Sequence, residues 1–312
     1  MFMSKHRPRG HVLITLFCLL TTTNFLQASV LNSYYTQYFY DLLQNNGQTH
    51  VNSESLKEEL HLILTGVHYP HEGEADEVKE FSGNYLFPES TLDCLEEGSC
   101  YLHHYYDYTE ARKIIFGRIY LQKNPKAQYF IHDVYCEKNY MQDDFSAKAP
   151  MGPDLIPDFH VMNLEHTWPQ SHFVHDSRFP TLMQKTDLHH VFPVSSRINS
   201  SRSNTPYGVV SENQSANMCP SAKLGPTQGD PNRKSFEPPL SHKGNVARAI
   251  FYFSITYQAP VDSIQEKFLR IWNLLDPVDE QEIANNETIF KLQHTRNPFV
   301  DHPDWINAID DF

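Results

Sequence analysis

Apolar side chains recur at helical spacing in several stretches of this chain. Between residues 55 and 65 they fall on one face of a helix, and Gly66 follows as a stop signal. A second helical pattern begins at Thr109, whose hydroxyl can cap a helix, and ends at Gly117. The same spacing predicts further helices over residues 34–43, 246–257 and 264–275.

Short apolar runs bounded by turn-forming residues predict β-strands. Such runs cover residues 129–135, 161–165 and 188–192. Pro193 suits the first position of a helix, because the N–H that proline lacks has no partner there. We therefore expect a short helix over residues 194–204, which completes a strand–strand–helix order.

Two stretches rich in turn-forming residues, 71–98 and 225–239, are predicted to be surface loops. No internal repeat or long low-complexity tract divides the sequence. The chain has 312 residues, of which 40% are hydrophobic, and this is enough to bury one sizeable core.

The first residues have the pattern of a secretory signal peptide. Three basic residues precede an apolar run from Val12 to Leu20, which is too short to span a bilayer comfortably. A small-residue cleavage site, Leu26-Gln27-Ala28, follows. We expect residues 1–28 to be removed and residues 29–312 to form a single domain. An uncleaved anchor helix is the alternative.

The charge of the chain limits how it can meet nucleic acid. The formal net charge is −13, and loss of three basic residues with the signal peptide makes it −16. This charge argues against a protein that coats DNA by bulk positive charge. Between residues 185 and 248, however, there are eight Lys and Arg and only four Asp and Glu, so positive charge is concentrated in this stretch.

Four cysteines remain once Cys18 leaves with the signal peptide. An even number in an exported protein suggests two disulfides. Three pairings are possible, and we favour a local Cys94–Cys100 bond with a long-range Cys136–Cys219 bond. A structural zinc site made by the four thiolates is the alternative, although the spacing lacks two CxxC pairs.

The most informative block is residues 163–171, NLEHTWPQS, which places a carboxylate beside an imidazole. Glu165 and the amide of Asn199 can supply the oxygen ligands that a hard divalent cation prefers. His166 can act as a base that is neutral near pH 7. Together these side chains predict a one-metal site for cutting a phosphodiester.

Three ordered blocks resemble bacterial endonuclease I, a family of secreted or periplasmic nucleases. The blocks are residues 163–171, residues 187–204 and Arg296-Asn297-Pro298-Phe299, and the resemblance runs roughly from residue 60 to residue 304. It implies an α+β fold with a His-Me finger, or ββα-metal, core at about residues 160–205 and helices around it.

The resemblance also implies roles for individual residues. His166 would take a proton from the attacking water, with Asp187 a candidate acceptor for its other ring nitrogen. Glu165 and Asn199 would bind the metal, and Asn204 is the second candidate for the amide ligand. Two protein ligands leave room for water and phosphate oxygens, which suits Mg²⁺, with Mn²⁺ or Ca²⁺ as substitutes.

Arginines are the natural phosphate ligands of such a site. Arg202 and Arg248 are expected to hold phosphates bidentately, with ordinary salt bridging as the alternative. Arg178 is a guess for the additional phosphate-binding arginine of the family. Trp168 is expected to pack in the core rather than to stack on a base.

These observations predict a secreted, magnesium-dependent endonuclease that cuts DNA, and also RNA, with little sequence preference and leaves 5′-phosphate ends. We expect a monomer without stable membrane association. A zinc hydrolase is one alternative, suggested by the pair His189 and His190 and by the spacing of His172 and His175. A disulfide-stapled nucleic-acid-binding protein without catalysis is the other.

Overall fold

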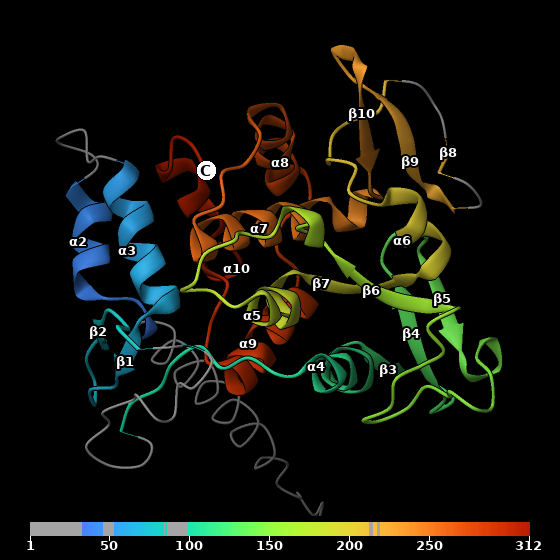
Figure 1. Ribbon diagram of the computed structural model, residues 1–312, viewed down its shortest axis with the longest axis horizontal. Coiled ribbons are helices and arrows are strands. Elements are labelled where there is room, and N and C mark those ends of the chain that lie inside the picture. Colours follow the sequence, from blue (N-terminus) through green and yellow to red (C-terminus); the bar gives the residue numbers. More distant parts are fainter. Residues whose placement is uncertain (1–32, 46–52, 84, 86–98, 212–214, 217–218) are drawn as a thin grey trace, which may run out of the picture.

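The computed structural model describes residues 33–45, 53–83, 85, 99–211, 215–216 and 219–312. This part of the chain is α+β, as predicted, with most helices on one side and most strands on the other (Figure 1). Within it, no helix is long and apolar enough to cross a membrane. The predicted signal peptide lies outside the described residues.

Helix α7 (Leu240–Tyr257) lies at the centre of the helical part (Figure 1). Most of its side chains are buried, as expected for a helix with neighbours on several sides. It packs against α8 (Ser263–Leu275) and α3 (Ser53–Thr65), which agree with the predicted helices. The other helices described are α2 (Gln37–Asn45), α4 (Tyr108–Ile114), α5 (Thr181–Thr186), α6 (Ser196–Arg202), α9 (Glu280–Gln293) and α10 (Pro298–Asp301), with 3₁₀ turns at Gln142–Asp144, Gln170–His172, Leu188–His190 and Pro303–Ala308.

The strands form four small antiparallel sheets among the described residues. Two sheets have three strands, in the orders β3-β4-β5 and β10-β9-β8, and two are simple pairs, β1-β2 and β6-β7. Their bounds are β1 (Val67–Tyr69), β2 (Glu77–Lys79), β3 (Leu121–Lys123), β4 (Tyr129–Asp133), β5 (Lys138–Met141), β6 (Met162–His166), β7 (Val191–Ser195), β8 (Ser215–Ala216), β9 (Cys219–Thr227) and β10 (Asp230–Glu237).

The predicted strand over residues 188–192 and the helix starting at Pro193 are wrong in their boundaries. Residues 188–190 form a 3₁₀ turn, and Pro193 lies inside β7, opposite Leu164. The carbonyl of Pro193 accepts a hydrogen bond from the N–H of Val134, on the side away from β6. Since N–H and C=O of one strand residue point the same way, the missing N–H is not needed for pairing with β6.

The predicted loop over residues 225–239 is also wrong, because most of it forms the hairpin of β9 and β10. The strands turn at Gly229, which has a φ of +85°. Pro231 lies where the pairing register shifts, between Asp230 and Lys234. Prolines are tolerated at such irregularities, so a composition typical of loops is compatible with this hairpin.

The helix predicted from Thr109 is capped two residues earlier, by Asp107, and does not end at Gly117. The carboxylate of Asp107 accepts from the N–H groups of Thr109 and Glu110 at 2.8 and 3.0 Å. The chain then continues as a π-helical segment, Ile115–Ile119, through Gly117. A Cβ on this glycine would lie 2.5 Å from the backbone nitrogen of Asp154, so close approach explains the glycine better than helix termination.

Candidate active site

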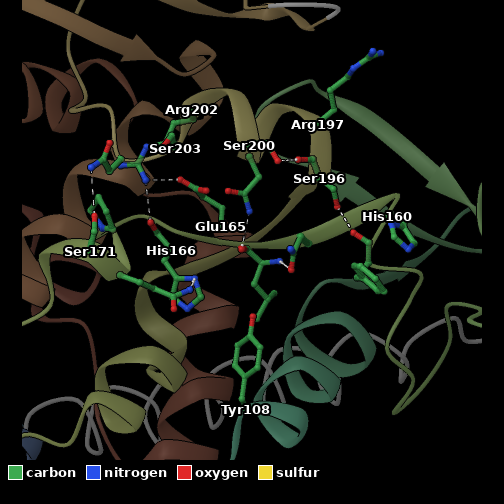
Figure 2. A pocket seen from close by; sticks show the side chains of 17 residues that line it. Tyr108, His160, Glu165, His166, Ser171, Ser196, Arg197, Ser200, Arg202 and Ser203 are labelled. Carbon is green, nitrogen blue, oxygen red and sulfur yellow. Dashed lines mark hydrogen bonds and ion pairs between the residues drawn. The ribbon is translucent and has the colours of Figure 1, made fainter.

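The predicted strand–strand–helix unit is present and carries the candidate residues. Strands β6 and β7 pair antiparallel, and α6 follows β7 directly. Glu165 and His166 are the last two residues of β6, and Asn199 lies in the middle of α6. All three line one open cavity of about 810 Å³, called here the polar cavity (Figure 2).

Asn199 holds α6 against β6. Its side-chain nitrogen Nδ2 donates to the carbonyl of Leu164 at 2.9 Å. That hydrogen bond orients the amide, so the oxygen Oδ1 is the atom available to a ligand in the cavity. The helix therefore presents a neutral oxygen donor beside the strand end that carries Glu165.

Glu165 is a buried carboxylate whose contacts are unevenly distributed. It is 1% exposed, and its Oε1 receives Arg202 Nη1 at 2.9 Å, Tyr135 Oη at 3.0 Å and Tyr207 Oη at 3.3 Å. Among the described residues, its other oxygen, Oε2, receives no hydrogen bond. Burial raises the pKa of this carboxyl group, and Arg202 and the two tyrosines oppose that rise.

The partners of Glu165 are themselves fixed. The hydroxyls of Tyr135 and Tyr207 lie 2.6 Å apart, and the guanidinium of Arg202 lies 4.5 Å from the ring centre of Tyr207. Arg202 also donates to the carbonyls of His166 and Thr167 at 3.2 and 3.0 Å. This network orients the carboxylate before any ligand arrives.

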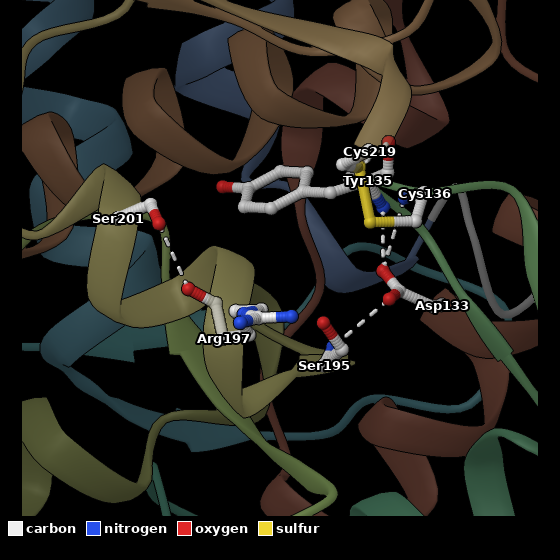
Figure 3. Close-up of a disulfide and its surroundings, with 7 residues drawn as sticks. All are labelled: Asp133, Tyr135, Cys136, Ser195, Arg197, Ser201 and Cys219. Carbon is white, nitrogen blue, oxygen red and sulfur yellow. Dashed lines mark hydrogen bonds between the residues drawn. A yellow bond between two sulfur atoms is a disulfide. The ribbon is translucent and has the colours of Figure 1, made fainter. Parts of the chain in front are cut away.

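The predicted Cys136–Cys219 disulfide is confirmed, and it lies close to this network (Figure 3). It joins the segment after β4 to the first residue of β9. Asp133 accepts from the N–H groups of Tyr135 and Cys136 at 3.0 and 3.1 Å with one oxygen, and from Ser195 at 3.0 Å with the other. The cross-link thus supports Tyr135 and the start of α6. The predicted Cys94–Cys100 bond involves Cys94, which lies outside the described residues.

His166 is held in one tautomer by two contacts. Its Nε2 lies 2.9 Å from the carbonyl of Lys185 and must donate, and its Nδ1 lies 3.1 Å from the side-chain nitrogen of Gln170 and must accept. Burial lowers the pKa of His166 to about 3, and the electrostatic interaction with His190 adds to the effect. The imidazole is therefore neutral near pH 7, and the lone pair of Nδ1 points to the side-chain amide of Gln170.

Asp187 is not the acceptor for His166, so that prediction is wrong. Its carboxylate is buried and receives the hydroxyls of Tyr252 and Tyr257 at 3.0 and 2.8 Å. It also receives the side-chain amide of Gln293 at 2.9 Å. Asp187 therefore joins the strand unit to helices α7 and α9. The acceptor for the imidazole of His166 is instead the carbonyl of Lys185.

The predicted arginines are distributed differently from expectation. Arg202 borders the polar cavity but is 1% exposed and turned inward to Glu165, so it positions the carboxylate rather than presenting a free fork to phosphate. Arg248 is fully buried in α7, bonded to both oxygens of Glu282 at 2.7 and 2.6 Å, and does not line the cavity. Its predicted phosphate contact is wrong. Arg178, paired with Asp176, is also outside the cavity lining.

Other side chains around the polar cavity are placed where they could contact a substrate. Arg197, on α6, lines the cavity and points away from the other labelled side chains (Figure 2). Tyr108 lies on the opposite side, with the ammonium of Lys185 4.0 Å from its ring centre. Asn204 lines the rim, 3.5 Å from Ser171, and so remains the second candidate for an amide ligand.

Two of the histidines that suggested zinc, His189 and His190, are engaged elsewhere. His189 and His190 are buried, and their Nε2 atoms lie 2.9 and 2.7 Å from the carbonyls of Thr295 and Gln184. In the described part of the chain, no group of three or more His, Cys, Asp or Glu is placed to hold a metal. That arrangement gives the zinc alternative no support. Trp168 packs in the core, stacked on Phe253 at 4.8 Å, as predicted.

A hard cation fits the donors present at the polar cavity. Oε2 of Glu165 and Oδ1 of Asn199 are oxygen donors on adjoining elements, and the open cavity admits water. Magnesium is typically bound by one or two protein oxygens and keeps several waters.

Glu165 and Asn199 were both identified from the sequence, whereas Tyr135, Tyr207 and Gln170 were not. Gln170 lay within the informative block, and the position of Tyr135 beside Cys136 was a usable signal.

The sequence profile of the family described as Endonuclease I matches residues 106–304, and this range includes the whole lining of the polar cavity. The match covers more than half of the chain. The chain therefore belongs to the endonuclease I family.

Individual relatives are similar over shorter stretches. The chain is 34% identical to the extracellular ribonuclease of Bacillus amyloliquefaciens over 166 residues, 47% of this chain and 53% of that protein. It is 32% identical to Endonuclease-1 of Buchnera aphidicola subsp. Baizongia pistaciae over 133 residues, 41% of this chain and 50% of that protein. With the extracellular deoxyribonuclease of Aeromonas hydrophila it shares 28% identity over 116 residues, 37% and 48% of the two chains. The matches thus span about half the length of these relatives.

Proposed function

We propose that this protein is a secreted, magnesium-dependent endonuclease with a His-Me finger active site. It hydrolyses phosphodiester bonds in DNA and RNA and leaves 5′-phosphate ends. The observation that carries this proposal is the convergence of Glu165, His166 and Asn199 on one open cavity, with the imidazole neutral and oriented.

His166 acts as the general base. The lone pair of Nδ1 now accepts from Gln170, whose side chain is exposed and can swing away. A water molecule that takes the place of this amide would donate its proton along the same line as it attacks phosphorus. The carbonyl of Lys185 keeps the ring from rotating and favours the imidazolium formed after proton transfer.

Glu165 and Asn199 would hold the metal through Oε2 and Oδ1. When bound, the cation would stabilise the charge that develops on the phosphate and on the 3′-oxygen leaving group. Arg202 and the two tyrosines keep Oε1 occupied, so the carboxylate would meet the cation through its other oxygen. Mn²⁺ and Ca²⁺ have the same preference for oxygen and are expected substitutes.

Substrate breadth and export are also proposed. The relatives include proteins named as a ribonuclease and as a deoxyribonuclease, both described as extracellular. Binding through phosphates carries no sequence information, so low specificity is expected. The Cys136–Cys219 disulfide suits an oxidising compartment outside the cytosol.

The proposal is tested by incubating purified protein with supercoiled plasmid and with single-stranded RNA, in magnesium and in a chelator. Nicking that needs the metal, with 5′-phosphate ends found by end-labelling, is the expected result. Binding without cleavage at any magnesium or manganese concentration would favour the non-catalytic alternative. Cleavage restored by zinc alone would favour the zinc hydrolase.

A further inference from the structure

A second, smaller cavity adjoins the polar cavity and is called here the side cavity. Its volume is about 230 Å³. Pro169, Arg202 and Asn204 line both cavities, so the two cavities are adjacent. A group that enters the side cavity can therefore belong to the molecule whose phosphate occupies the polar cavity.

The side cavity has polar walls and an apolar wall, and the apolar wall is the one suited to a ring. Trp168, Pro206 and Ile250 provide apolar surface. The indole of Trp168 is fixed, because one face stacks on Phe253 with the rings 13° apart and its N–H donates to the carbonyl of His172 at 2.9 Å. A small cavity with one fixed apolar wall suits a planar ring better than a flexible chain.

The polar side chains that line the side cavity include the ion pair of Arg233 and Asp262, and among them Gln265 offers a directional contact. Gln265 lines it, and the side-chain oxygen of Gln265 accepts the backbone N–H of Tyr207 at 2.7 Å. Its side-chain nitrogen makes no hydrogen bond to any residue in the described part of the chain. This nitrogen is a donor only, so it is suited to a carbonyl oxygen or a ring nitrogen of a ligand.

We propose that the side cavity is a subsite for one nucleobase of the nucleotide next to the scissile phosphate. This inference rests on the proposed function, and it makes cleavage dependent on the base at one flanking position. A base can enter only when it is unpaired and unstacked, so single strands, loops and frayed ends become the favoured substrates. Gln265 selects bases that present an acceptor on the edge that enters.

Binding of short ligands in a chelator tests the subsite without any cleavage. The probes are dinucleotides with one phosphodiester, carrying either two bases or an abasic sugar on one side, in competition with a labelled single-stranded oligonucleotide. Removing the base on one side should weaken binding about tenfold, in the range of base stacking on protein side chains. Removal on the other side should change it less than about threefold. Equal losses on both sides would overturn the subsite.

Cleavage of a single-stranded oligonucleotide with randomised positions provides the second test. The wild type should show a base preference at one position next to the cut. Gln265→Glu keeps an oxygen for the N–H of Tyr207 but replaces the donor with an acceptor, so it should change which base is preferred. Gln281→Glu, the same substitution at an exposed position of α9, is the matched control and should keep the wild-type preference.

His172→Ala is a second variant, because His172 is an exposed residue that also lines the side cavity. It should weaken the preference without changing its identity. Cleavage without base preference in the wild type would reject the subsite and leave the nuclease proposal standing. Absence of cleavage would reject the nuclease proposal, and the dinucleotide affinities would still decide the subsite.

Discussion

Two buried arginine–glutamate pairs lie in different regions of this molecule, and they differ in how completely the carboxylate is used. In the helical core, Arg248 meets both oxygens of Glu282, at 2.7 and 2.6 Å. At the polar cavity, Arg202 and its neighbours meet only Oε1 of Glu165. A fully satisfied carboxylate is a structural bridge, whereas one with an oxygen left at a cavity can bind a ligand.

The surroundings of the two pairs explain the difference. Arg248 also donates to Asn273 and to the carbonyl of Asp276, both at 3.0 Å, so protein groups accept four hydrogen bonds from its guanidinium. Glu165 lies at a strand end that borders about 810 Å³ of open space. Both carboxylates are largely buried, and Glu165 differs in having an oxygen without a hydrogen bond among the described residues and a cavity beside it.

The largest expected effect comes from replacing His166, the proposed general base. His166→Ala should lower the rate of plasmid cleavage by about 10²–10⁴-fold, because the proton of the attacking water loses its acceptor. The melting temperature and the metal affinity should change little. Rates under saturating magnesium, compared with a thermal melt of the same sample, check this. A variant that retains near wild-type rate would exclude His166 as the base.

Metal binding should respond to the two oxygen ligands and not to the base. Glu165→Gln and Asn199→Ala should each raise the magnesium concentration for half-maximal activity by at least about tenfold, the effect typical even of residues that only orient metal ligands. Metal titrations of each variant give this value. Unchanged titration curves for both would show that the cation binds elsewhere, with Asn204→Ala as the next variant to test.

The two arginines provide the direct test of the comparison. Arg248→Met leaves Glu282 buried without its partner and should destabilise the protein by about 3–5 kcal/mol, with near wild-type activity per folded molecule. Arg202→Met should lower both stability and activity, because Glu165 loses its orientation. Urea unfolding and activity at a temperature where each variant is folded separate the two cases. Equal loss of specific activity in both variants would contradict the distinction between a structural pair at Arg248 and a ligand-orienting pair at Arg202.

Loss of the Cys136–Cys219 disulfide should have a smaller effect. Replacing both cysteines by serine should lower the free energy of unfolding by about 2–4 kcal/mol, if the cross-link acts mainly on the unfolded chain. Since Asp133 connects the cross-linked segment to Ser195, metal affinity should weaken as well. The wild type treated with a reductant is the companion sample. Unchanged stability in both samples would show that the disulfide does not stabilise the fold.

The smallest effect concerns pH and buried histidines away from the proposed metal ligands. Burial lowers the pKa of His103 to about 4 and that of His242 to about 3, from an ordinary 6.5. The unfolded chain therefore binds more protons below pH 6.5, so this stability is complete above pH 6.5 and is lost as pH falls towards the folded values. His242→Phe should flatten the fall between pH 7 and pH 5 by at most about 2 kcal/mol. An unchanged slope in urea unfolding across this range would contradict it.

Local pattern was sufficient for much of the architecture. Helical spacing located α3 and α8 closely, because their apolar faces repeat without interruption. It was less reliable where tertiary contacts override composition. Pro193 was tolerated in β7 because its missing N–H faces away from β6, and residues 225–239 formed a hairpin despite their prolines.

By itself, the sequence determined the family, the α+β class and the three residues that meet at the polar cavity. These depend on ordered motifs. Chemistry that needs a carboxylate, an imidazole and an amide requires those residue types within short motifs, where they can be read from the sequence. Only the tertiary structure decided that Lys185 and Gln170 orient His166, and that Arg202 faces Glu165 while Arg248 is enclosed by helices. The physical reason is that hydrogen-bond partners and burial depend on segments far apart in the chain, and sequence spacing does not record which of them will meet.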